Sequence, residues 1–107
     1  MILILAEDNH ELREAASGEV SFRSADSVDG VEPVDAVLGW IESEPVERIV
    51  IPYPLVINLN PFALARRLRK IHGPPVVLAG DLRLDIQFWA ERNGCEVARS
   101  VEDAIGQ

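Results

Sequence analysis

The hydrophobic pattern of the chain consists of five short apolar runs, each followed by polar or turn-forming residues. Residues 2–6, 48–51 and 75–80 are almost continuously apolar, which is typical of strands covered on both faces. Residues 19–25 alternate apolar and polar positions, the period of a half-buried strand, and residues 95–99 form a further short run. The pattern therefore predicts five strands.

Helical spacing occupies the segments between these strands. Apolar residues recur at i, i+3, i+4 and i+7 in the clearest segment: Val34, Val37, Leu38 and Ile41. Pro33 suits the first turn of this helix, and Pro45 ends it. A shorter helix is predicted after the first strand, where either Asp8 or Asn9 suits the N-cap and Gly18 can end the helix.

A third helix is predicted after Asn60, which suits the N-cap, with Pro61 in the first turn and Gly73 at the end. Three apolar residues at helical spacing are expected to face inward: Leu64, Leu68 and Ile71. The cationic residues between them then face outward.

Two more helices are predicted, over Leu84–Ala90 with Phe88 or Trp89 facing inward, and over 100–105 with Ser100 as the cap. Five strands then alternate with five helices, the order of consecutive right-handed βαβ units with parallel strands. The predicted fold is an α/β three-layer sandwich around a five-stranded parallel sheet of (βα)5 order.

Composition and charge narrow the classes of function. A chain of 107 residues with 48% hydrophobic residues fits a single domain over residues 1–107. The single cysteine, Cys95, excludes an intramolecular disulfide and favours a reducing, cytoplasmic location. A formal net charge of −8 argues against binding to nucleic acid. The first apolar run lacks the basic flank of a signal peptide and the length of a membrane span, so no membrane contact is expected.

Acidic residues follow two of the predicted strands at the same edge of the sheet. Glu7 and Asp8 come directly after the first strand, and Asp81 follows the fourth. Carboxylates gathered at this edge are suitable ligands for Mg²⁺. A simpler interpretation makes Asp8 the cap of the first helix and leaves Glu7 in solvent.

Two stretches of the sequence resemble response-regulator receiver domains. ILILAEDNHELRE is similar to the first strand and turn of that family, and ALARRLRKIHGPPVVLAG to its third helix and fourth strand. The order of elements is similar over the whole chain. The resemblance implies a receiver-like or flavodoxin-like order of the sheet, a signalling function, and an acid pair that binds magnesium after the first strand.

The chain departs from that family at the other functional positions. The phosphoacceptor aspartate at the end of the third strand is replaced by Pro52 or Tyr53, depending on register. At the end of the fourth strand, the family's hydroxyl residue is replaced by Ala79. Near the end of the fifth strand, where the family has a lysine, the only cation is Arg99. The chain therefore resembles an atypical, or pseudo-, receiver: a module that is not an enzyme and that docks protein partners without phosphorylation.

An alternative interpretation keeps the acids as a working site. Glu7, Asp8 and Asp81 would then hold the metal of a small divalent-metal phosphotransferase or hydrolase that resembles the Toprim family. That family has an Asp-x-Asp after its third strand, where this sequence has Pro-Tyr-Pro. In the pseudo-receiver interpretation no cofactor is needed, apart from weak Mg²⁺ binding by the acid pair.

Three surfaces are candidates for contact with a protein partner. The third helix carries four cations that either bind an acidic partner or form a solvated face: Arg66, Arg67, Arg69 and Lys70. The loop 52–61 is unusually apolar, and it either folds onto the core or meets a partner. Trp89 suits an interface on the fourth helix, including a homodimer formed through the last two strands and helices.

Overall fold

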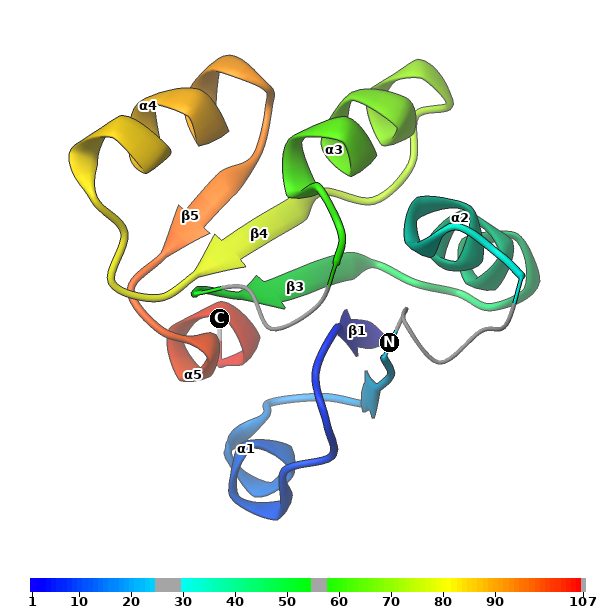
Figure 1. The fold of residues 1–107 in the computed structure, drawn as a ribbon. Helices are drawn as coiled ribbons and strands as arrows, with labels where there is room; N and C mark the ends of the chain where they lie inside the picture. The colour runs from blue at the N-terminus through cyan, green and yellow to red at the C-terminus, as the bar shows by residue number, and fades with distance from the viewer. Residues whose placement is uncertain (25–29, 55–57, 107) are drawn as a thin grey trace.

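The computed structural model describes residues 1–24, 30–54 and 58–106, and within these ranges five strands alternate with five helices (Figure 1). The strands are β1 (Ile2–Ile4), β2 (Val20–Phe22), β3 (Arg48–Pro52), β4 (Val76–Ala79) and β5 (Glu96–Ala98). The helices are α1 (His10–Ala15), α2 (Pro33–Ser43), α3 (Pro61–Lys70), α4 (Leu84–Arg92) and α5 (Val101–Ile105).

The sheet has the strand order β2-β1-β3-β4-β5, and every neighbouring pair is parallel. Helices α2, α3 and α4 cover one face, while α1 and α5 cover the other (Figure 1). The prediction of a three-layer α/β sandwich with flavodoxin-like order is therefore confirmed. In the part of the chain that the structure describes, no helix has the length and apolar character needed to cross a membrane.

Two apolar clusters, one on each face, hold the layers together. Side chains alternate along β1, so that Leu3 packs toward α2, α3 and α4 while Ile2 and Ile4 pack toward α1 and α5. The central strands contribute to both clusters, which explains why their sequences are continuously apolar.

β3 extends one residue beyond the predicted range 48–51, although proline cannot donate a hydrogen bond to a neighbouring strand. Pro52 is the last residue of β3 and lies in register with Ala79 of β4. The next N–H, that of Tyr53, donates to the Ala79 carbonyl at 2.7 Å. Hydrogen bonding between β3 and β4 therefore continues beyond Pro52, which has no N–H to donate.

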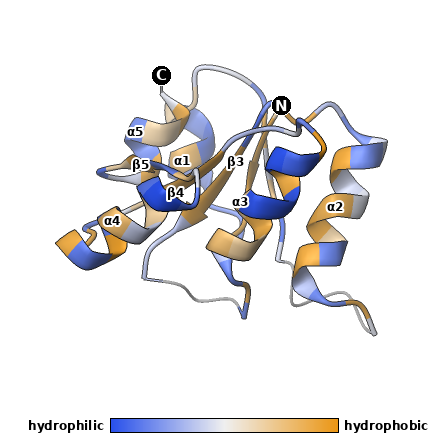
Figure 2. Cartoon of the chain, turned by 90° about the horizontal axis from the view of Figure 1, so that it is seen from above, coloured by the Kyte–Doolittle hydropathy of each residue, from blue (hydrophilic) through white to orange (hydrophobic). Residues whose placement is uncertain are grey.

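The inward faces of two helices also differ from the prediction. Ile71 does not face inward: it is the C-cap of α3 and is 59% exposed, because the helix ends at Lys70. The expectation that Phe88 or Trp89 faces inward is wrong, since both are about half exposed. Ile86 and Ala90 pack against the core instead (Figure 2 shows the hydrophobic bands on α4).

Candidate functional site at the carboxyl edge of the sheet

The parallel strands bring four chain segments to one edge of the sheet. The residues after β1, β3, β4 and β5 lie there, since Ile4 pairs with Val50, and Ala79 pairs with both Pro52 and Ala98. This is the edge at which α/β sheets commonly bind ligands. The predicted acids and the replaced phosphoacceptor position follow these strands.

The acid pair after β1 is tied to α1 through Asp8. Arg13 donates from Nη2 to Asp8 Oδ2 at 3.1 Å and from Nε to Oδ1 at 3.4 Å. The same guanidinium donates to the Val20 carbonyl at 3.3 Å and lies 5.2 Å from the centre of the Phe22 ring. Arg13 therefore joins the β1–α1 loop to β2 as well as neutralising Asp8.

The cap of α1 is Asn9, whose side-chain oxygen accepts from the Leu12 N–H at 3.1 Å. The interpretation of Asp8 as the cap is therefore wrong, because its carboxylate turns to Arg13 instead. Glu7 is exposed at the end of the strand. The helix ends at Ala15, three residues before Gly18, because Ala16 has extended backbone angles.

The three acids do not come together as a metal centre. Across residues 1–24, 30–54 and 58–106, no group of three or more His, Cys, Asp or Glu side chains is close enough to hold a metal ion. Glu7 and Asp8 thus lack Asp81 as a third ligand, and Asp8 already has a cationic partner. Mg²⁺ binds through one or two carboxylates and otherwise keeps water ligands, so Glu7 and Asp8 are the acids at this edge that could contact it.

Pro52 and Tyr53, where the resemblance expects the phosphoacceptor, are packed closely against β4. The Tyr53 ring is half-buried against the core, and the Tyr53–Pro54 peptide bond is cis. Gly80 follows β4 with a φ of +151°, and a Cβ at this position would collide with the Tyr53 carbonyl. The end of β3 thus carries a proline and a tyrosine, neither of which has a carboxylate. Gly80, directly after β4, packs against the main chain of Tyr53.

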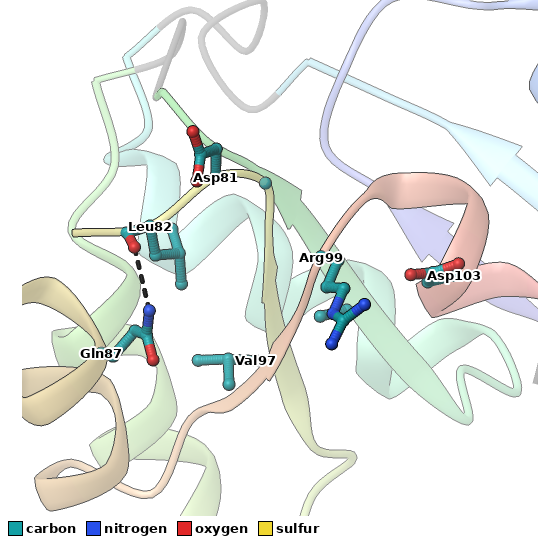
Figure 3. Close-up of a pocket in the computed structure, with 8 residues that line it drawn as sticks. Asp81, Leu82, Gln87, Val97, Arg99 and Asp103 are labelled. Atoms are coloured by element: carbon teal, nitrogen blue, oxygen red, sulfur yellow. Dashed lines mark hydrogen bonds between the residues drawn. The ribbon is translucent and has the colours of Figure 1, made fainter. Parts of the chain in front are cut away.

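An open pocket of about 880 Å³ lies beside these residues, between the ends of β4 and β5 (Figure 3). The side chains labelled in the figure are Asp81, Leu82, Gln87, Val97, Arg99 and Asp103. Gln87 closes one wall by donating from Nε2 to the Leu82 carbonyl at 2.9 Å. Two carboxylates and one guanidinium give the pocket a mixed charge.

Sequence reasoning identified Asp81 and Arg99 and missed the rest of this pocket. Gln87, Val97 and Asp103 come from three different elements and share no motif. The signal that could have found them is the topology itself, because residues after adjacent parallel strands must meet at one edge.

The four cations of α3 point to different neighbours rather than forming one patch. Arg67 pairs with Asp35 of α2 at 3.6 Å, whereas Arg66 donates from Nη1 to Asn93 Oδ1 at 2.6 Å, at the end of α4. Arg69 lies over Gly94, and Lys70 is exposed. All four side chains are in contact with solvent, as predicted.

The outer face of α4 carries large apolar side chains that nothing in the described chain covers. Leu84, Phe88 and Trp89 are 83%, 55% and 51% exposed. The rings of Phe88 and Trp89 pack edge to face with centroids 5.7 Å apart, and Arg92 lies over Phe88. Val97, at the neighbouring edge strand, is exposed as well.

The apolar loop and the cysteine make smaller contributions to a candidate site. Leu59 is buried in the core, while residues 55–57 of the predicted apolar surface lie outside the described part of the chain. Burial raises the pKa of the Cys95 thiol to about 11, despite the opposing charge of Arg66. A thiol with so high a pKa is a packed core group and a poor nucleophile.

Comparison with known proteins found no matching family model and no matching curated protein. Five solved chains do match, among them the following two. A response regulator receiver domain protein (CheY-like) from Methanospirillum hungatei JF-1 has 16% identity and a TM-score of 0.64, over 92% of this chain and 78% of that chain. A DNA-binding response regulator of the LuxR family from Staphylococcus aureus has 19% identity and a TM-score of 0.62, over 97% of this chain and 92% of that chain. The chain therefore has the fold of response-regulator receiver domains.

Proposed function

We propose that this chain is a non-enzymatic signalling or scaffold module that binds a protein partner without being phosphorylated. The observation that carries the proposal is the end of β3, where Pro52 and Tyr53 stand at the position that the resemblance gives to the phosphoacceptor aspartate. Neither side chain offers a carboxylate. The N–H of Tyr53 also donates to the Ala79 carbonyl, so the main chain at this position is hydrogen-bonded to β4.

The ion pair beside β1 supports the same function. In a magnesium site, the positive charge next to the acids comes from the metal ion. Here the Arg13 guanidinium lies beside Asp8 and supplies positive charge from within the chain. The acid pair is thus partly neutralised without a metal, and its remaining role is structural.

The proposed docking surface is the α4 face, defined by Leu84, Phe88, Trp89 and the neighbouring Val97. Covering these side chains removes a large apolar area from water, and aromatic residues are enriched at the energetic centres of interfaces. Residues 81–97, from which this face is built, contain four acids and two arginines. A partner with an apolar centre and a basic rim would complement this face.

The experiment that tests phosphorylation independence is a titration of the purified chain with MgCl₂ and then beryllofluoride, followed by amide chemical shifts. We expect no saturable change at Glu7, Asp8 or Tyr53. The Arg13→Ala variant is the matched control, because it frees Asp8 and is expected to respond to Mg²⁺ more than the wild type. Saturable shifts in the wild type, or Mn²⁺-dependent hydrolysis of p-nitrophenyl phosphate that Asp8→Ala abolishes, would overturn the proposal.

The docking surface is tested with the Phe88→Ala Trp89→Ala double variant, and Val31→Ala serves as a control at an exposed apolar residue elsewhere. Loss of two aromatic anchors is expected to weaken a bound partner by more than about tenfold. The measurement is binding of the partner with and without acetyl phosphate, which should make no difference. Sedimentation of the chain alone decides whether the partner is a second copy, since a dimer doubles the mass.

A further inference from the structure

The amino-terminal edge of the sheet, opposite to the candidate site, holds a second open pocket of about 360 Å³. Its floor consists of Leu68 of α3 and Val76 of β4, both buried. The Pro74–Pro75 pair and two glycines form its rim. Its volume lies within the range of pockets that hold small ligands or single side chains.

One arginine, Arg69, forms a wall of this pocket, and the neighbouring main chain makes room for it. Gly94 has a φ of +79°, and a Cβ there would lie 2.9 Å from Arg69 Cδ and 3.1 Å from its Nη1. The Arg69 side chain therefore lies against Gly94 in the α4–β5 turn, and a side chain at position 94 would displace it. Arg66 reaches the same turn through Asn93.

The cations at this corner lack acidic partners. Among the described residues, no carboxylate lies within ion-pair distance of Arg66, Arg69 or Lys70, whereas Arg67 on the same helix is paired with Asp35. Arg69 at the pocket and Arg66 at the adjoining turn therefore place positive charge without a described carboxylate partner beside an apolar pocket, in a chain of net charge −8. A cation next to an apolar cavity complements a ligand that carries a carboxylate beside an apolar group.

We propose that this pocket binds an acidic peptide segment of a partner protein. One carboxylate pairs with Arg69, and an adjacent apolar side chain enters the pocket over Leu68 and Val76. A peptide fits this chemistry better than a nucleic acid does, because an extended polyanion would also meet the acidic remainder of the surface. The proposed site includes neither Phe88 nor Trp89, so peptide binding at this pocket and partner binding at the α4 face can be tested independently.

The test is a titration of the ¹⁵N-labelled chain with a synthetic peptide of sequence acetyl-Leu-Glu-Glu-Leu-Glu-amide. We expect saturable amide shifts at Gly73, Val76 and Gly94, and weaker binding as salt is raised. The same peptide with glutamine in place of glutamate is expected to bind at least about tenfold more weakly, since hydrogen bonds to charged groups are the stronger ones.

Two variants of α3 distinguish binding of the peptide in the pocket from general attraction by the positive charge of the helix. Arg69→Met keeps the apolar stem over Gly94 but removes the charge, and it is expected to weaken the peptide at least about tenfold. Arg67→Ala removes an equal charge from the paired side of α3 and is expected to change binding by less than about twofold. The unshifted amides of each variant report whether the fold is intact.

Three outcomes would overturn the proposal. The first is equal weakening by Arg69→Met and Arg67→Ala, which would mean that net charge alone attracts the peptide. The second is the absence of saturable shifts at the pocket in the folded wild type. The third is displacement of the peptide by a short oligodeoxynucleotide at the same concentration and salt, which would assign the cations to nucleic acid.

Discussion

Gly80 is the residue whose backbone conformation leaves the least room for substitution. Its φ of +151° is one that side chains rarely adopt, and a Cβ would collide with the Tyr53 carbonyl. Both effects act on the strand ends that shape the candidate site. A glycine before an acid at the end of β4 is therefore required by packing, whatever the site binds.

The Gly80→Ala variant is expected to lower the free energy of unfolding by about 2 kcal/mol or more, measured by urea denaturation. Gly39→Ala is the matched control, because Gly39 lies inside α2 with nothing within 4 Å of a built Cβ. That change should raise stability by roughly 0.5–1 kcal/mol, the usual advantage of alanine in a helix. Equal midpoints for Gly80→Ala and the wild type would show that Tyr53 moves freely.

At the scale of elements, the left-handed residue that ends α3 lies one position before the glycine that the sequence pattern indicates. Gly73 was the predicted helix stop, but the left-handed position belongs to His72, with a φ of +53°. The Gly73 N–H donates to the Leu68 carbonyl at 2.8 Å, and the His72 N–H to the Arg69 carbonyl at 3.4 Å. This is the Schellman pattern, in which glycine normally occupies the place of His72.

His72→Gly is accordingly expected to stabilise the fold, by roughly 0.5–1 kcal/mol, because it removes the Cβ strain at a left-handed residue. The gain is partly offset by the greater freedom of glycine in the unfolded chain. His72→Ala keeps a Cβ and removes the imidazole, so it should change thermal stability by only a few tenths of a kcal/mol. If His72→Ala raised the stability as much as His72→Gly does, the imidazole rather than the left-handed backbone would be the destabilising feature.

The number, type and order of elements could be predicted, whereas several inward faces and site contacts could not. In α4, Ile86 with Ala90 and Leu84 with Phe88 each lie four residues apart, so spacing alone cannot choose the buried pair. Ile86 and Ala90 pack against the core, whereas Leu84 and Phe88 are exposed. The Arg13–Asp8 pair was missed for a similar reason, since only the backbone turn between them brings them together.

At the scale of the whole molecule, one ion pair joins the exposed edge of the sheet to the helix layer. Arg23, directly after the edge strand β2, forms a two-pronged pair with Glu44, the C-cap of α2, and lies 5.3 Å from the centre of the Trp40 ring. The hydrogen bond from Arg23 holds the pKa of the Glu44 carboxyl below its ordinary value of 4.5, against the opposing effect of desolvation. The pKa of Arg23 is raised in turn by the same hydrogen bond.

The sign of the pH dependence follows from that lowered pKa. A carboxyl that is more acidic in the folded chain stabilises the fold at any pH above its unfolded value, and the stabilisation is lost as the pH falls through the folded value. Glu44→Gln is therefore expected to reduce the midpoint of urea unfolding at pH 7, and the difference from the wild type should shrink below about pH 4.5. Glu42→Gln, at an exposed position of the same helix, removes one carboxylate as a control and should leave the urea midpoint at pH 7 nearly unchanged. A Glu44→Gln deficit that stays constant down to pH 3 would mean that packing against Trp40, rather than charge, joins β2 to α2.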